Sequence, residues 1–103
     1  LFDLQTVKAR LAEIRMKIDV ARAFVDKCLV QATAGTLTAE RSSMAKLWAT
    51  EMEVEVADSC AHLHGAMGMS LEHPISRIVT ASRAHRYAMG VSEMQRETIM
   101  RSL

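Results

Sequence analysis

A single apolar stripe from Leu4 to Cys28 limits what the rest of the chain can be. Its residues are spaced alternately three and four apart, which places them on one face of an α-helix. They are Leu4, Val7, Leu11, Ile14, Ile18, Ala21, Val25 and Cys28. Charged residues occupy most positions between them and form the solvated face. The spacing predicts a helix of about 30 residues, about 45 Å long at the usual rise per residue, that ends at Ala34-Gly35.

A helix of this length needs a long partner, either in the same chain or in a neighbouring subunit. The sequence supplies one after Gly35. Thr38 is the predicted N-cap, Glu40 suits the first turn, and an apolar period continues to Gly65. The periodic residues are Ala45, Trp48, Ala49, Met52, Val56, Cys60 and Leu63. The short connection predicts an antiparallel hairpin, with the acidic residues between Glu51 and Asp58 on a solvated face.

Two shorter helices are predicted in the remainder of the chain. Pro74 suits the first turn of a helix that runs to about Ala88, before Gly90 ends it. Its inner face is predicted to consist of Ile75, Ile78, Val79 and Ala81. Ser92 and Gln95 have the spacing of a capping box, with Ser92 as the N-cap of a last helix. The predicted fold is all-α, an antiparallel helical bundle of two long and two shorter helices.

Composition limits the class of protein. A chain of 103 residues forms one domain at most, or a piece of a larger one. The net charge of +1 gives no electrostatic argument for nucleic acid or an anionic membrane as a partner, and no apolar run is long enough for a membrane helix. The two cysteines do not make a disulfide framework. These features predict a soluble, helical, intracellular protein.

The periodic pattern stops in the segment from Cys60 to Met69, which contains Gly65 and Gly68. One interpretation is a helix C-cap followed by a tight turn, because glycine accepts the left-handed conformation found at helix ends. The other is a backbone platform for a bound ligand, because a glycine lets the backbone approach another surface closely. Residue pattern alone leaves both interpretations open.

Five different short motifs are distributed along nearly the whole chain. They are Leu4-Gln5 continuing to Leu11-Ala12-Glu13-Ile14, then Met44-Ala45-Lys46-Leu47, Leu63-His64-Gly65-Ala66-Met67-Gly68-Met69, His73-Pro74-Ile75-Ser76-Arg77, and Gly90-Val91-Ser92-Glu93-Met94-Gln95-Arg96. Each is weak alone, but all of them in this order are specific. With them the chain resembles the C-terminal helical domain of the acyl-CoA dehydrogenases, which has Leu-His-Gly-Gly-x-Gly-Tyr, Tyr-Pro-x-x-Arg and Gly-Thr-Ser-Glu-Ile-Gln-Arg in these places.

The resemblance implies a fold and a role. In this family the domain is a helical bundle that packs against its counterparts in an oligomer and holds FAD where subunits meet. The enzymes oxidise an acyl-CoA substrate to the enoyl-CoA and pass electrons to an electron-accepting flavoprotein. By position, the cofactor-binding residues implied here are Gln5, His62, Gly65, Ala66, Val91 and Glu93, and the residue implied to meet substrate or flavin through its backbone is Gly90.

The departures from the family pattern concern the chemistry directly. Many members have Glu before this Gly as the catalytic base, but here the residue is Met89, whose thioether cannot accept a proton. Val91 lacks the hydroxyl of the usual Thr, Ala66 replaces a Gly, and Thr80-Ala81 replaces an Arg-Asp pair. Either the base lies on an earlier helix upstream of Leu1, as in isovaleryl-type and long-chain relatives, or this is a degenerate subunit of a heteromeric enzyme. The sequence leaves both explanations open and assigns no catalytic residue.

The chain also lacks counterparts of the family's N-terminal and middle domains and of the first helix of the C-terminal domain, so a fragment is expected. A metal site at Cys60, His62 and His64 is disfavoured, because a closed zinc site needs four ligands. The arginines at 77, 83 and 86 are expected on a solvated face. Two functions therefore remain open. The chain is either part of a flavin-dependent acyl-CoA dehydrogenase or a non-catalytic helical assembly module, such as a degenerate partner subunit. Exposed apolar stripes predict a homo-oligomer in either case.

Overall fold

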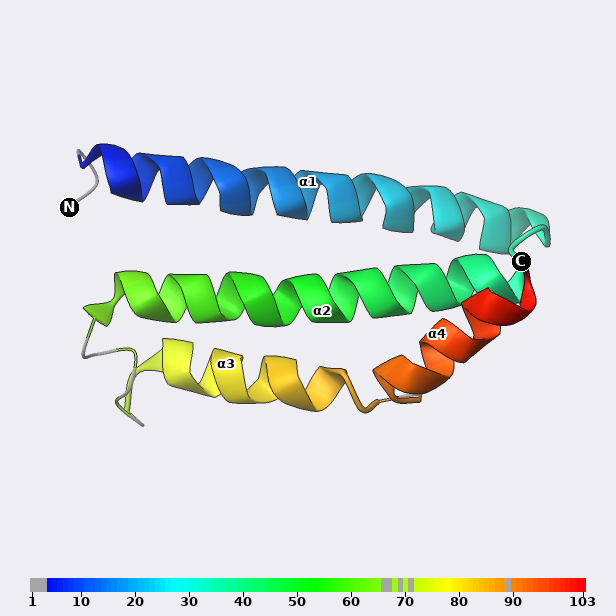
Figure 1. The fold of residues 1–103 in the computed structure, drawn as a ribbon. Helices are drawn as coiled ribbons and strands as arrows, with labels where there is room; N and C mark the ends of the chain where they lie inside the picture. Colours follow the sequence, from blue (N-terminus) through cyan, green and yellow to red (C-terminus); the bar gives the residue numbers. More distant parts are fainter. Residues whose placement is uncertain (1–3, 66–67, 69, 71, 89) are drawn as a thin grey trace.

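The computed structural model describes residues 4–65, 68, 70, 72–88 and 90–103. Within them the chain forms four α-helices and no strand (Figure 1). The helices are α1 (Gln5–Ala34), α2 (Ala39–Leu63), α3 (Pro74–His85) and α4 (Ser92–Arg101). This confirms the predicted all-α bundle of two long and two shorter helices.

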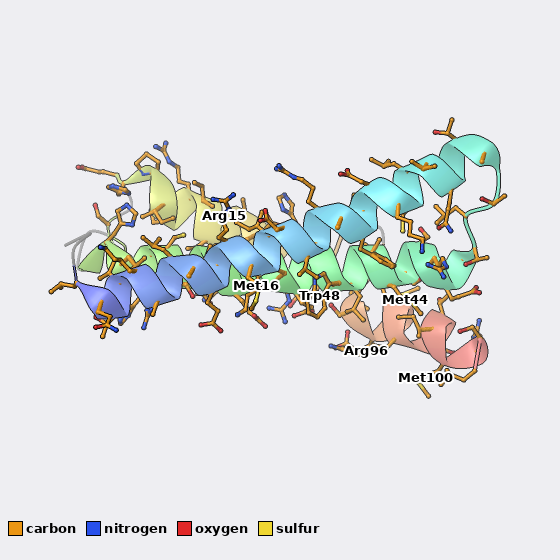
Figure 2. The ribbon with its side chains drawn as sticks, turned by 90° about the horizontal axis from the view of Figure 1, so that it is seen from above. Arg15, Met16, Met44, Trp48, Arg96 and Met100 are labelled. Carbon is orange, nitrogen blue, oxygen red and sulfur yellow. The ribbon has the colours of Figure 1, made fainter. Side chains whose placement is uncertain are left out.

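The two long helices form the predicted antiparallel hairpin and pack against each other (Figure 1), crossing obliquely in the view of Figure 2. Gly35 ends α1 in the left-handed region, with φ of 74°, and its amide donates to the carbonyl of Ala32 at 3.2 Å. Thr38 is the N-cap of α2, as predicted, and its hydroxyl oxygen accepts from the amide of Arg41 at 3.3 Å. Both ends of the turn are therefore determined by local sequence signals.

Helix α2 is the centre of the described fold. The other three helices all pack on it, with α1 on one side and α3 and α4 in succession on the other (Figure 1). A helix with neighbours on several sides has no single buried face. Ser43 and Ala57 are its buried residues, whereas Trp48, one of the periodic apolar residues, is 51% exposed. The apolar period of α2 therefore does not mark a buried position at Trp48.

The α1 stripe packs against α2 as predicted, with Ile14, Ala21 and Cys28 buried, except at Leu4, which precedes the helix as its N-cap and is 56% exposed. The inner face of α3 differs from the prediction. Ile75 and Ser82 are buried, while Ile78 is 52% exposed. The Ser82 hydroxyl donates to the carbonyl of Val79 at 2.7 Å, which satisfies its polar group and allows a serine to be buried where an apolar residue was expected.

The ends of the short helices also differ from the prediction. Helix α3 ends at His85 and not near Ala88, and α4 has Val91 as its N-cap in place of Ser92. Ser92 is the first helical residue, and its hydroxyl donates to the carboxylate of Glu51 on α2 at 2.6 Å. The predicted capping role of Ser92 was wrong because this hydroxyl is used in a tertiary contact.

An apolar groove remains open along the hairpin. Val20 and Phe24 of α1 and Met44 and Trp48 of α2 line it, and it encloses about 290 Å³. Met16, Trp48 and Met44 follow one another along the same edge of the α1–α2 pair in Figure 2. None of the helices, in the part of the chain that the structure describes, has an apolar stretch long enough to cross a membrane.

Candidate functional site

The hairpin brings the beginning of α1 next to the end of α2, and a cleft lies between them. It encloses about 230 Å³ and is lined by Thr6, Val7, Arg10, His62 and Leu63. Gln5 is the first residue of α1 and directly precedes this lining. Gln5 and His62, both predicted cofactor-binding residues, therefore lie at the same end of the molecule because the long helices are antiparallel. We call this region the hairpin-end cleft.

The hairpin-end cleft has the chemistry of an anion site. The first amides of a helix have no intrahelical partner and carry the positive end of the helix dipole. Leu4 precedes α1 as its N-cap and has no polar side-chain atom to satisfy them, and the first turn of α1 contains no acidic residue. Arg10 and His62 add side-chain donors to the same cleft. This donor set suits a phosphate or pyrophosphate group.

The glycine turn lies beside the hairpin-end cleft. His64 is the C-cap of α2, and Gly65 follows with φ of 62°, the left-handed conformation predicted from the sequence. A Cβ atom on Gly68 would overlap the carbonyl oxygen of Ala61, so the backbone approaches α2 more closely than any other residue type allows. The imidazole of His64 donates to the carbonyl of Cys60 at 2.7 Å. Ala66, the neighbouring predicted residue, lies outside the described residues.

A second, smaller cleft lies at the start of α4. It encloses about 100 Å³, and its lining residues are Glu51, Arg86, Tyr87, Ser92, Glu93 and Arg96. It includes the predicted residue Glu93 and adjoins two others, Gly90 and Val91. Gly90 has φ of 108°, and Val91 is the N-cap of α4. Met89, which the sequence resemblance aligns with the family's usual base, lies outside the described residues.

Two α2 residues hold this region in place. The ammonium group of Lys46 donates to the carbonyl of Arg86 at 2.8 Å and to the carbonyl of Gly90 at 2.6 Å. The carboxylate of Glu51 accepts from Ser92 and pairs with Nε of Arg86 at 3.4 Å. The hydrogen bond from Ser92 is the main reason why the pKa of Glu51 lies below its ordinary value. Partial burial opposes this shift, and the charges of Arg86 and Arg96 support it.

These roles are not evident from the sequence. There Lys46 stands out only as part of a motif, Glu51 is expected on a solvated face, and Arg86 is expected outside the site. The acidic stretch of α2 in fact faces cations on its neighbours, with Glu55 bound to Lys17 at 3.0 Å and Asp58 near Arg83 at 3.6 Å. No apolar period marks such pairs, so only the position of α2 between the other helices reveals them.

The predicted residues form two groups and not one site. Gln5, His62 and Gly65 lie at the hairpin-end cleft, and Gly90, Val91 and Glu93 lie at the start of α4. Helix α3 separates the groups (Figure 1), and its 12 residues correspond to about 18 Å. Among the described residues, no three His, Cys, Asp or Glu side chains gather as a metal site would require, and Cys60, His62 and His64 do not form one.

Comparisons with known proteins agree with this architecture. The sequence profile of the acyl-CoA dehydrogenase C-terminal domain matches residues 1–103. The long-chain specific acyl-CoA dehydrogenase of mitochondria from Sus scrofa is 40% identical over 100 residues, which are 97% of this chain and 23% of that protein. The chain therefore spans about a quarter of the length of this relative.

Solved structures show the same fold. The crystal structure of an acyl-CoA dehydrogenase from Geobacillus kaustophilus superposes with a TM-score of 0.94 at 36% identity, covering 98% of this chain and 27% of that one. Butyryl-CoA dehydrogenase from Megasphaera elsdenii gives a TM-score of 0.94 at 24% identity, covering 99% of this chain and 27% of that one. At the lower identity the likeness concerns the fold alone.

Proposed function

Because this chain belongs to the acyl-CoA dehydrogenase family, whose C-terminal domain it matches throughout, we propose that it is the flavin-contacting and oligomerising part of an FAD-dependent acyl-CoA dehydrogenase. The reaction would introduce a double bond between the α and β carbons of an acyl-CoA thioester. The observation that carries this proposal is the hairpin-end cleft, which lies between the start of α1 and the end of α2, is lined by Arg10 and His62, and lies beside the glycine turn.

The residues present fit the phosphate part of FAD. The amides at the start of α1 and the side chains of Arg10 and His62 would hold the pyrophosphate, while Gln5, Gly65 and Ala66 would contact the rest of the cofactor on this side. When bound, the flavin supplies the acceptor for the hydride that leaves the β carbon. The protein would contribute binding, orientation and exclusion of water from the reacting groups.

The start of α4 would supply the second contact region. Gly90 would meet the substrate or flavin through its backbone, and Val91 and Glu93 would contact FAD. Because α3 separates this region from the hairpin-end cleft, we propose that the two regions contact different cofactors, one of them in a neighbouring subunit. A homo-oligomer, a dimer or tetramer, would follow from this arrangement, and the exposed apolar groove of the hairpin is consistent with further contacts.

The proton-abstracting base is not assigned to this chain. Met89 cannot serve, so a carboxylate elsewhere in the full-length protein would have to lie within hydrogen-bond reach of the α carbon. We expect the 103-residue chain alone to be inactive toward acyl-CoA. A flavoprotein would accept the electrons, and the protein would act in the cytoplasm or, in a eukaryote, in the mitochondrial matrix, as the mitochondrial name of one relative suggests.

The identity of Met89 also favours a second candidate function. A chain without the usual base can serve as a degenerate partner subunit or as a helical assembly module. The two candidates differ in flavin binding and turnover by the full-length protein. A carboxylate on a helix that precedes this domain would favour the dehydrogenase, and its absence would favour the assembly module.

The test is a visible absorption spectrum of the full-length protein after incubation with excess FAD and desalting, followed by addition of acyl-CoA without an acceptor. Retained flavin bands that bleach with acyl-CoA are the expected result. His62→Ala should weaken FAD binding about tenfold, the effect of one hydrogen bond to a charged group. Lys27→Met, at an exposed position on α1, is the control and should bind FAD normally. A colourless full-length protein would rule out the dehydrogenase.

A further inference from the structure

The connection between α3 and α4 is held from α2 by two residues of opposite charge, Lys46 and Glu51. We call this pair the α2 brace. Lys46 binds the carbonyls of Arg86 and Gly90, and Glu51 binds the side chains of Arg86 and Ser92. These partners lie at both ends of the connection, so a single helix contacts both the end of α3 and the start of α4.

The signs of the two charges match the helix ends they face. Arg86 is the C-cap of α3, where unpaired carbonyls make the helix end negative, and the cation of Lys46 lies on its carbonyl. Ser92 is the first residue of α4, where the helix end is positive, and the anion of Glu51 lies there. Each charge is stabilised by the helix dipole that it meets, so the arrangement would be unfavourable with the two residues exchanged.

The brace fixes the orientation of one peptide group. The carbonyl of Gly90 points at Lys46 over 2.6 Å. The structure contains no cis peptide bond among the described residues, and in a trans peptide the next N–H points the opposite way. The amide of Val91 therefore points away from Lys46. Gly90 adopts φ of 108°. Because glycine accepts many backbone conformations, the local sequence alone does not fix the orientation of this peptide group.

We propose that Lys46 is a positioning residue, which rests on the proposed function: through the carbonyls of Arg86 and Gly90 it holds the Gly90 backbone where it meets acyl-CoA or flavin. Glu51 supports the same position from Ser92. A small displacement of backbone groups at a reacting centre has a large effect on rate, whereas binding of the remote parts of substrate and cofactor would be largely kept. The role therefore concerns kcat more than affinity.

The test uses the full-length protein as wild type, Lys46→Met, Lys46→Arg and the control Lys27→Met. Hydrogen exchange is followed in peptides that span residues 86–95, and kcat, KM and the flavin spectrum are measured well below the melting temperature. For Lys46→Met we expect exchange to rise at least about tenfold in these peptides, and kcat to fall about 100-fold, with KM changed by less than about threefold and flavin still bound. Lys46→Arg keeps a charged donor and should recover much of kcat.

Other outcomes overturn the proposal in distinguishable ways. Unchanged exchange at 86–95 in Lys46→Met would show that Lys46 does not hold the connection. Faster exchange with normal kcat would remove the positioning role, as would a loss of kcat that follows the loss of folded protein or of flavin. If the wild type neither binds flavin nor turns over acyl-CoA, the proposed function fails and the positioning role fails with it, while the exchange result still decides whether the brace exists.

Discussion

The two sides of α2 are held by different forces. Toward α1 the buried residues of α1 are Ile14, Ala21 and Cys28, and the ion pair of Lys17 with Glu55 lies at the exposed edge of the contact. Toward α3 and α4 the buried residues include Ser82 and Ser92, and Lys46 and Glu51 make directed bonds across the contact. Apolar contacts are nondirectional and stabilise in proportion to area, whereas hydrogen bonds fix atoms at particular places. The proposed substrate contact at Gly90 lies on the directed side.

The largest effect is expected where the apolar side is broken. Ala21 is 4% exposed in the α1–α2 contact, and Ala21→Glu would bury an unpaired charge. We expect a loss of at least about 3 kcal/mol in the free energy of unfolding, measured by urea denaturation followed by circular dichroism. Ala23→Glu, at an exposed position of the same helix, is the control and should change stability by less than about 0.5 kcal/mol. Equal effects of the two substitutions would mean that α1 does not pack on α2 through this face.

The next prediction compares the glycine turns of the two sides. Gly35, in the hairpin, has φ of 74°, and a Cβ atom added there would meet open space. Gly90 has φ of 108°, and a Cβ atom there would lie 2.8 Å from Nε2 of Gln95. Gly35→Ala should cost about 1 kcal/mol, the usual penalty for a left-handed residue. Gly90→Ala should cost about 2 kcal/mol, because its φ lies beyond the left-handed region that other residues tolerate.

Urea denaturation of the two alanine variants measures this difference directly. Because the side chain of Gln95 can move, the backbone conformation and not the contact is expected to dominate at Gly90. A smaller loss for Gly90→Ala than for Gly35→Ala would show that the connection between α3 and α4 relaxes easily, and this would also weaken the case for the α2 brace.

Glu51→Gln tests the charge in the brace by its dependence on pH. The folded state lowers the pKa of Glu51, so it favours the carboxylate. The stability from this group is therefore fully present above the unfolded pKa of about 4.3 and is lost as the pH falls through the lower folded pKa. At pH 7, Glu51→Gln should lower the free energy of unfolding by about 1 kcal/mol, since the amide keeps an acceptor for Ser92 but loses the ion pair.

The measurement is the difference in the free energy of unfolding between wild type and Glu51→Gln from about pH 7 to pH 3. The difference should shrink toward acid pH, because the wild-type carboxylate becomes protonated there and resembles the amide. A difference that is constant over this range would show that the charge of Glu51 does not contribute and that only its shape matters.

The two sides also differ in how far the sequence could predict them. The α1 stripe, the Gly35 turn and the Thr38 cap follow from local rules, and they were predicted correctly because each signal lies within a few residues. The failure at Ser92 arises because its partner, Glu51, lies 41 residues away on α2. Trp48 was misplaced because α2 contacts three helices and has no single buried face, whereas Ser82 can be buried because its hydroxyl is satisfied within α3 by the carbonyl of Val79. Lys46 and Arg86 are 40 residues apart, so no periodic pattern could connect them.

The candidate site was predictable only in part, and for the same reason. The family motifs marked Gln5, His62, Gly90 and Glu93 one by one, and the antiparallel hairpin explains why the first two lie together. The helix predicted from Pro74 lies between these residues in the sequence, but the pattern alone does not show that this helix also holds the two groups apart in space. The pattern of charges indicates only a solvated face for Arg10. Its place in the hairpin-end cleft could not be predicted, because the other wall of that cleft is formed by the end of α2.

The smallest effect is expected at Arg83 of α3, which faces the acidic residues of α2 but is not a partner of the α2 brace. Its guanidinium lies 3.6 Å from the carboxylate of Asp58, and the two side chains are 62% and 48% exposed. Arg83→Gln should therefore change the free energy of unfolding by about 0.5 kcal/mol or less, and about 0.5 M salt should abolish the change, since exposed pairs are weak and screened.

The effects of Glu51→Gln and Lys46→Met should persist in the same salt, because their partners are partly buried. If Arg83→Gln matched Glu51→Gln in size and salt dependence, the attraction between α2 and α3 would be a general property of their opposite charges, and the brace would have no special part in placing Gly90.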